Sequence, residues 1–254
     1  MKVMENMYDE VLRYVLREPF LHPYTIHDIR HLRESTTVYA YYEDDVLKGY
    51  ALIFHGLRDH LSIIIDGEEG EAVSELFEYV SSRIPLKRAI IHVPIRYREI
   101  ALRYVKPLSL YEAYSMYATG DMLKEPLMKL NVLFTELTDL SGYEIPEFIS
   151  RRMEYLGKRF GAVMGNRIIA FGGLYVHEPE VSMVGSIWVD PEYRGRGLGK
   201  AITYYVSRKA LEKSRYACLW VNVNNVPAVR AYLGVGYRIA RREAWINVGV
   251  DISP

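Results

Sequence analysis

The chain has 254 residues, of which 50% are hydrophobic, and its 32 basic and 32 acidic side chains give a formal net charge of zero. This balance disfavours nucleic acid and anionic lipid as partners, and we find no apolar run of the roughly 18 residues that span a bilayer. The single cysteine, Cys218, excludes an internal disulfide and a thiolate metal site. We therefore expect a cytoplasmic protein that binds no metal, and the excess of arginine over lysine favours a heat-loving source.

The first half of the chain alternates strands and helices. Residues 1–20 are amphipathic and contain acidic side chains, which predicts a helix and not a signal peptide. After them, β-branched apolar runs predict strands and helical spacing of apolar residues predicts helices. The expected strands are 46–54, 61–67 and 89–95, and the expected helices are 68–83 and 97–105.

The second half repeats this order. Strands at 167–176 and 182–190 form an expected antiparallel hairpin, because Pro179 marks a turn between them. A helix at 201–214, a strand at 218–223, a helix at 226–235 and a strand at 237–248 follow. Because the two halves share one order of elements, we predict an internal duplication with domains 1–125 and 126–254, joined by a polar linker at 119–131.

The stretch YRGRGLGKAI, residues 193–202, places three glycines at the start of a predicted helix. A Walker A loop is excluded because its spacing fails and Ala201 replaces the hydroxyl residue, and the dinucleotide fingerprint fails on its glycine spacing. A strand enters the stretch and a helix leaves it, so successive backbone N–H groups can bind a phosphate there. The residues alone therefore predict an anion site for a phosphorylated cofactor.

Two signatures in this half resemble those of the GNAT superfamily of acyl-CoA-dependent N-acyltransferases. Arg194-x-x-Gly197-x-Gly199 is similar to its Arg/Gln-x-x-Gly-x-Gly/Ala motif. The later run Asn225-x-x-Ala228-x-x-x-Tyr232-x-x-x-Gly236-Tyr237 is similar to its second motif, with tyrosine for the final phenylalanine. The resemblance covers roughly residues 133–248. It implies an α/β (α+β) fold of two GNAT-like mixed-sheet domains, each with a mostly antiparallel sheet, flanking helices and a splayed strand pair.

The resemblance also implies a function and a set of site residues. It implies acetyl transfer from acetyl-CoA to a primary amine, with no metal. Tyr232 is expected to donate a proton to the coenzyme A sulfur, and the Val189 N–H to polarise the thioester carbonyl. Residues expected to bind the cofactor are Ile187, Trp188 and Val189 along the pantetheine arm, Arg194, Gly195, Arg196, Gly197, Leu198, Gly199 and Lys200 at the pyrophosphate, and Asn225 and Tyr232.

The general base is the least defined part of this expected site. Many members of the family carry a glutamate at the position of Val181, which cannot accept a proton. Glu180 is the candidate that remains beside it, with Glu178 and His177 as alternatives in the same turn. An amine that arrives neutral is a further alternative.

The first half lacks the phosphate loop. At the corresponding position it carries Glu68, Glu69 and Glu71, which would repel a pyrophosphate. Tyr104 aligns with Tyr232, but without a cofactor loop it has nothing to protonate. We therefore expect a degenerate copy that has lost cofactor binding.

Several other features carry no expected chemistry. Cys218 is expected in the core, and the charged run 240–243 on the surface. His22, His27 and His31 lack a third ligand at a characteristic spacing and are expected to be surface residues. The acceptor stays open between a small-molecule amine and a protein amino group, as does the oligomeric state. The alternative function is a non-catalytic acyl-CoA-binding sensor or scaffold.

Overall fold

The computed structural model describes residues 2–128, 130–152 and 155–250, and they form two compact units. Unit 1 consists of the chain up to Glu18, Tyr24–Tyr114 and the described residues from Arg241 onward. Unit 2 consists of Pro19–Pro23 and Ser115–Ala240. Among the described residues, no helix is both long enough and apolar enough to cross a membrane.

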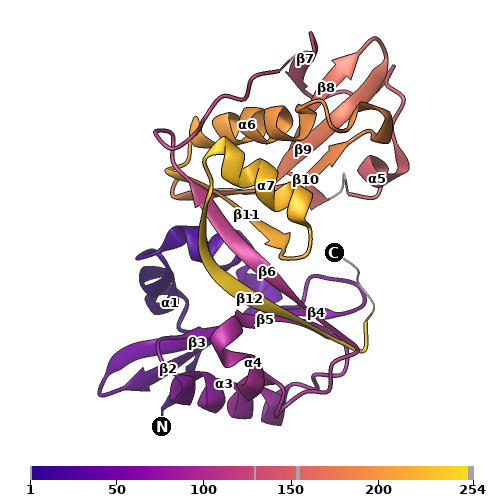
Figure 1. Cartoon of the computed structure of the whole chain (residues 1–254). Helices are drawn as coiled ribbons and strands as arrows, with labels where there is room; N and C mark the ends of the chain where they lie inside the picture. The colour runs from indigo at the N-terminus through magenta and orange to yellow at the C-terminus, as the bar shows by residue number, and fades with distance from the viewer. Residues whose placement is uncertain (1, 129, 153–154, 251–254) are drawn as a thin grey trace. The chain divides into compact units, whose positions relative to one another are not determined.

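Unit 1 is built on a sheet in the order β1-β2-β3-β4-β5-β12-β6 (Figure 1). Its strands pair antiparallel from β1 to β4, and β4 and β5 are parallel. The elements that begin in this unit are β1 (Val3–Glu5), α1 (Tyr8–Val15), β2 (Thr36–Glu43), β3 (Val46–Phe54), β4 (Leu61–Gly67), α3 (Gly70–Arg83), β5 (Ala89–Pro94), α4 (Arg98–Ala101) and β6 (Ser109–Ala118), and α2 (Pro23–His31) lies in it from Tyr24 onward.

Unit 2 is built on a sheet in the order β6-β11-β10-β9-β8-β7. Strands β7 to β10 pair antiparallel, and β10 and β11 are parallel. The elements that begin in this unit are β7 (Leu133–Glu136), α5 (Glu147–Ser150), β8 (Lys158–Met164), β9 (Arg167–His177), β10 (Val181–Val189), α6 (Leu198–Leu211), β11 (Tyr216–Asn222), α7 (Val226–Val235) and β12 (Arg238–Val248).

The two units repeat one arrangement. In each, four strands run antiparallel, a long helix leads to a fifth strand parallel to the fourth, and a second helix follows. The long helices are α3 and α6, and the parallel pairs are β4–β5 and β10–β11. The duplication predicted from the order of elements is confirmed.

The compact units divide the chain differently from the expected domains 1–125 and 126–254. The strand that follows each repeat contributes to both units: β6 passes from unit 1 into unit 2 at Ser115, and β12 passes from unit 2 into unit 1 at Arg241. In unit 1, β12 lies beside β5 with Ile246 opposite Ile91. A strand's own pattern of apolar residues is the same whichever sheet it joins. The sequence therefore carries no signal for this exchange.

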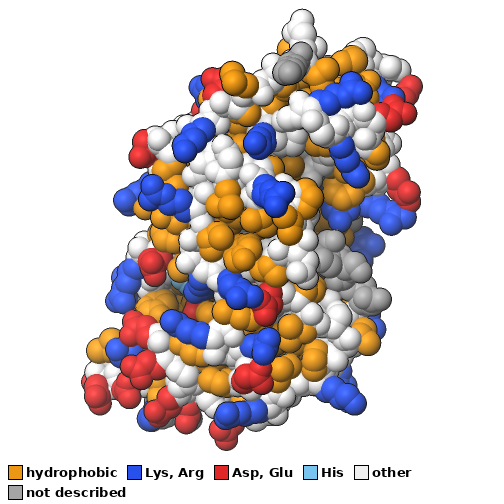
Figure 2. All heavy atoms as spheres, in the orientation of Figure 1, with side chains coloured by type: hydrophobic (Ala, Val, Ile, Leu, Met, Phe, Trp, Pro, Cys, Tyr) orange, Lys and Arg blue, Asp and Glu red, His pale blue; other side chains and the backbone are white. Residues whose placement is uncertain are grey.

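Apolar side chains from both faces of the sheets form the cores. In unit 1, α3 buries one face against the sheet, and Ala244, Ile246 and Val248 of β12 join that cluster. The expectation that the run 240–243 is solvated holds for Arg242, which is exposed, and is wrong for Glu243, which is buried. Arg241 lies between the buried carboxylates of Asp66 at 2.6 Å and Glu243 at 2.5 Å. On the face shown in Figure 2, basic, acidic and hydrophobic side chains are interspersed.

Candidate functional site

The site begins where β10 and β11 separate. These parallel strands pair only between Val181–Met183 and Tyr216–Cys218, whereas β10 stays paired with β9 as far as Val189. Beyond Met183, β10 therefore has one open edge, which is the splayed pair expected from the sequence. The Asp190 N–H donates to the Ile169 carbonyl at 2.9 Å. Because backbone N–H groups alternate in direction along a strand, the Val189 N–H points to the open edge.

A bulge interrupts β10 next to this edge. Ser186 and Ile187 together lie opposite Gly172, since Gly185 pairs with Gly173 and Trp188 pairs with Phe171. Ser186 has a left-handed backbone, with φ of 53°. The Ile187 side chain covers Gly172, where a Cβ atom would come within 2.6 Å of Ile187 Cδ1. Bulges and left-handed non-glycine residues both concentrate at functional sites.

The glycine-rich stretch forms the start of α6. Gly195 and Gly197 have φ of 74° and 86°, a conformation that other residues adopt only with strain. Gly197 is the N-cap of α6, and the Ala201 N–H donates to its carbonyl at 3.1 Å. The N–H groups before Ala201 are the ones that a helix start leaves without intrahelical acceptors. The loop therefore presents a row of backbone donors at the positive end of the α6 dipole.

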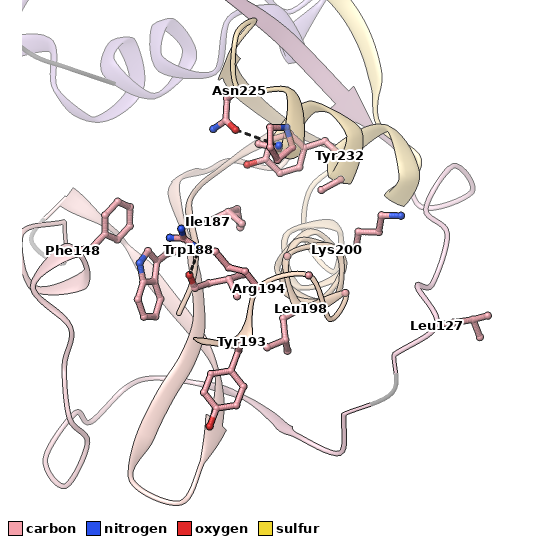
Figure 3. Close-up of a pocket in the computed structure, with 17 residues that line it drawn as sticks. Leu127, Phe148, Ile187, Trp188, Tyr193, Arg194, Leu198, Lys200, Asn225 and Tyr232 are labelled. Carbon is pink, nitrogen blue, oxygen red and sulfur yellow. Dashed lines mark hydrogen bonds between the residues drawn. The ribbon is translucent and has the colours of Figure 1, made fainter. Parts of the chain in front are cut away.

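A pocket of about 860 Å³ connects this loop to the open edge of β10 (Figure 3). Two cations, Arg194 and Lys200, line it, and none of its described lining residues is Asp or Glu. Arg194 Nε donates to the Val189 carbonyl at 3.1 Å, which fixes the guanidinium beside the loop. Arg196 does not line the pocket, and its guanidinium lies 5.5 Å from the ring centre of Tyr193. The pocket is thus suited to an anionic ligand with an extended apolar arm.

Helix α7 forms the wall opposite β10. Asn225 is its N-cap, with Oδ1 accepting from the Ala228 N–H at 3.3 Å, and Gly236 ends it with φ of 108°. Asn225 therefore shapes the pocket wall as a helix cap, a role that the sequence analysis did not assign to it. Ala228 and Ala231 of the same helix also line the pocket.

Tyr232 projects from α7 into the pocket and is 8% exposed. Burial raises the pKa of its phenol to about 12. The hydroxyl therefore stays protonated at neutral pH, and it will release its proton only to a base formed close by. Its neighbour Tyr237 donates to or accepts from Ser207 Oγ at 2.6 Å, which anchors the end of α7 on α6.

None of the candidate bases lines this pocket. Glu180 lies in the turn before β10, and its main-chain carbonyl accepts from the Tyr216 N–H at 3.0 Å. Glu178 in the same turn is 6% exposed. His177 Nδ1 lies 2.6 Å from Ser182 Oγ, and burial lowers the pKa of its imidazole. The pocket residues of β10 are Ile187 to Val189, at the other end of the strand.

Other lining residues were not found from the sequence. Phe148 of α5 stacks on Trp188, with ring centres 6.3 Å apart and planes inclined by 18°. The Arg152 guanidinium lies 3.9 Å from the Phe148 ring centre on α5. Leu127 of the linker also lines the pocket. Helix α5 is too short for a periodic apolar pattern, so only the folded chain reveals this aromatic wall.

The remaining candidates lie outside the pocket. Cys218 is fully buried, as expected, and burial raises the pKa of its thiol. The ring centres of His27 and His31 are 4.9 Å apart on α2. His22 is 7% exposed, so the expectation of a surface residue is wrong for it.

In unit 1, side chains of the chain itself bond to the equivalent strand edge. Strands β4 and β5 pair only as far as Ile64 and His92, so β4 also gains an open edge. There the Gly67 carbonyl accepts from Arg96 at 3.1 Å and from the Tyr97 hydroxyl at 3.0 Å.

The acidic residues at the start of α3 make ion pairs with lysines, Glu68 with Lys48 and Glu71 with Lys2, both at 2.9 Å. Tyr104, the counterpart of Tyr232, lies with its hydroxyl 3.1 Å from Ser74 Oγ. These contacts give the acidic loop and the second tyrosine structural partners within unit 1.

The match to a protein family falls within unit 2. Residues 127–237 match the Acetyltransferase (GNAT) family. A mycothiol acetyltransferase of Corynebacterium glutamicum is 31% identical over 77 residues, which are 30% of this chain and 26% of that protein. The chain thus spans only about a quarter of the curated relatives that it matches.

Solved structures match over the whole length. A Drosophila protein has a TM-score of 0.70 at 16% identity and covers 95% of both chains. A tandem GNAT protein from the clavulanic acid biosynthesis pathway has a TM-score of 0.57 at 10% identity and covers 99% of this chain and 100% of its own. These likenesses establish the fold. Residues 127–237 therefore match the Acetyltransferase (GNAT) family, and the chain has a two-domain fold like that of the tandem GNAT protein.

Proposed function

We propose that this protein is an acyl-CoA-dependent N-acyltransferase that moves an acetyl group from acetyl-CoA to a primary amine by direct attack. The observation that carries the proposal is one pocket in unit 2 that contains the donor loop of α6, the open edge of β10 and the Tyr232 hydroxyl. The acceptor is a small-molecule amine or a protein amino group. Unit 1 carries no cofactor, because its counterpart of the loop is acidic and its open strand edge bonds to Arg96 and Tyr97.

The lining residues suit acetyl-CoA. The left-handed glycines and the α6 N–H groups bind the pyrophosphate, with Arg194 beside them. The open edge of β10 at Ile187–Val189 pairs with the amide groups of the pantetheine arm. Trp188 packs against the arm, and the Asn225 cap holds the start of α7 across from it. The absence of Asp and Glu from the described lining residues favours a ligand with several negative charges.

In the reaction, bound acetyl-CoA supplies a thioester whose acyl carbon accepts the amine nitrogen. The Val189 N–H polarises the carbonyl oxygen from the open edge of β10. Tyr232 gives its proton to the sulfur as the carbon–sulfur bond breaks, so that the thiol and not the thiolate departs. The proton that the amine loses passes to solvent, and Tyr232 is reprotonated. Glu180 would accept the proton of the amine only through a water molecule, because Glu180 does not line the pocket.

A sensor or scaffold that binds acyl-CoA without turnover is the second candidate. One observation favours it: no carboxylate among the described residues lines the pocket, so a direct general base is lacking there. A pure binder has no need of a buried phenol at the thioester, which favours the transferase.

Calorimetric titration with acetyl-CoA tests the proposal. We expect one site per chain in the wild type and none in Gly197→Val, because a β-branched side chain at φ of 86° distorts the loop. Two sites would contradict the assignment of unit 1, and a folded protein that binds nothing would overturn both candidates.

A panel of primary amines, assayed by thiol release from acetyl-CoA, then separates transferase from sensor. Because Cys218 is buried, the folded protein itself adds little thiol signal.

A further inference from the structure

Lys200 holds an unusual position for a cation at the start of α6. It lines the pocket, and its tip rests against Gly234 in the last turn of α7. A Cβ atom at Gly234 would lie 3.1 Å from Lys200 Cε and 3.2 Å from Nζ. Glycine at this position therefore leaves the space that the lysine occupies.

The charge of Lys200 lacks a protein counterpart in the pocket. A cation in the first turn of a helix is unfavourable, because the helix dipole is positive there. Lys209 near the other end of α6 pairs with Glu212 at 2.6 Å. Beside Lys200, by contrast, no Asp or Glu is found among the described lining residues. An anionic ligand would offset this unfavourable placement.

Lys200 and Arg194 lie at different positions in the pocket. Figure 3 shows them on opposite sides of the start of α6. Arg194 is fixed on the β10 side by its bond to the Val189 carbonyl, and Lys200 lies on the α7 side against Gly234. The row of loop N–H groups lies between them. A ligand with two separate anionic groups uses both cations, whereas a lone pyrophosphate needs only the loop and Arg194.

We propose that Lys200, seated against Gly234, binds the ribose 3′-phosphate of coenzyme A and makes the site selective for the 3′-phosphorylated cofactor. This rests on the proposed function, since the pyrophosphate must occupy the loop. The ribose joins the two phosphate groups, so the 3′-phosphate lies near the loop but apart from it. A lysine ammonium at the end of a flexible stem binds such a group as a point charge.

Titration calorimetry with coenzyme A and with 3′-dephospho-coenzyme A tests this assignment. The wild type is expected to bind coenzyme A at least about tenfold more tightly than 3′-dephospho-coenzyme A, because a charge-assisted hydrogen bond to the 3′-phosphate has about this free energy. Lys200→Ala should lose this preference while it binds dephospho-coenzyme A as the wild type does, and Lys200→Arg should restore most of the preference. Lys209→Ala on the same helix is the matched control and should leave both affinities unchanged.

Gly234→Ala provides a variant that keeps the lysine. Alanine favours the helix over glycine, so α7 should be at least as stable. Its Cβ would lie 3.1 Å from Lys200 Cε, so the lysine tip must shift slightly, which should reduce the preference for coenzyme A by a small factor with little effect on dephospho-coenzyme A. Rising salt should weaken the preference in the wild type more than in Lys200→Ala.

The outcomes separate this inference from the proposed function. If neither compound binds to the folded wild type, the proposed function itself fails. If the wild type binds both equally, or if Lys200→Ala weakens both by the same factor, the 3′-phosphate assignment is wrong while the cofactor pocket stands. A fall in melting temperature of Lys200→Ala with an unchanged preference would show that the lysine only supports α7.

Discussion

The Tyr175 hydroxyl lies 2.6 Å from Ser186 Oγ, across the β9–β10 hairpin. The Tyr175 ring covers Gly185, where a Cβ atom would come within 2.4 Å of it, and Ser186 has φ of 53°. This contact therefore holds the β10 bulge from one face of the sheet, while Ile187 covers Gly172 on the other. The strained residue directly precedes the pocket residues of β10.

Replacement of Ser186 tests whether the left-handed bulge stores strain. Ser186→Ala loses the hydrogen bond and keeps the strain, whereas Ser186→Gly loses the bond and relieves the strain. Relief of about 1–2 kcal/mol exceeds the extra backbone entropy of glycine, about 0.5–1 kcal/mol. In urea unfolding, Ser186→Gly should therefore be about 0.5–1 kcal/mol more stable than Ser186→Ala.

Ser62 of β4 is the matched control for this comparison, because its φ is not positive. There the alanine variant should be the more stable of the two. The same order at Ser186 would contradict the strained bulge.

The loop glycines Gly197 and Gly199 should differ in their tolerance of alanine. Gly197 has φ of 86°, so Gly197→Ala should cost about 1 kcal/mol of folding free energy and at least about tenfold in acetyl-CoA affinity. Gly199 has no positive φ, and an added Cβ would lie 3.8 Å from Val189 Cγ2, an ordinary contact. Gly199→Ala should therefore bind acetyl-CoA within a few-fold of the wild type. Calorimetry on both variants decides this, and equal losses would mean that the ligand itself excludes a side chain at Gly199.

His92 of β5 should make the stability of the protein fall in mild acid. Burial against Trp245, with ring centres 4.5 Å apart, lowers the pKa of His92 to about 3. Between that value and the ordinary pKa near 6.5, the unfolded chain binds a proton that the folded chain does not, so stability is lost as the pH falls. From pH 8 to pH 5 this amounts to about 1–2 kcal/mol.

Urea unfolding of His92→Phe at both pH values measures this contribution. The variant should lose less stability on acidification than the wild type. His55→Phe, at an exposed position after β3, should retain the wild-type dependence. An unchanged dependence in His92→Phe would assign the acid sensitivity to other groups.

The sequence predicted some of the strands and helices, and several of them with accurate bounds. Strands β3 and β4 match the expected ranges 46–54 and 61–67, and α7 ends at Gly236 as expected. The short elements β1, β7 and α5 were not predicted, because three or four residues carry no measurable period. The longer strands β2, β6 and β8 were not predicted either. The partner of Arg241 was also missed, since Asp66 is distant in sequence.

The site was predictable where its chemistry depends on local backbone. The left-handed glycines and the tyrosine on α7 are each set by a few consecutive residues, whereas the capping role of Asn225 was not assigned from the sequence. The Phe148–Trp188 stack and the Tyr175–Ser186 contact depend on strand pairing and on how α5 packs, which no short pattern encodes. For the same reason the distance of Glu180 from the pocket became evident only in the folded chain.

Tyr232→Phe is the decisive variant for the catalytic proposal. If Tyr232 protonates the departing sulfur, turnover with an amine from the panel should fall by about 10² while acetyl-CoA affinity stays within about twofold, since only the hydroxyl is lost. Because burial holds its pKa at about 12, the donor stays protonated across the assay range, and wild-type turnover should show no alkaline loss from this group below about pH 10.

Tyr104→Phe is the matched control, because Tyr104 occupies the corresponding place in unit 1 with its hydroxyl beside Ser74. It should leave turnover unchanged. Wild-type turnover in Tyr232→Phe would remove Tyr232 from the mechanism and leave the sulfur to take its proton from water. A parallel loss in Tyr104→Phe would instead mean that unit 1 takes part in catalysis, against its assignment as the degenerate copy.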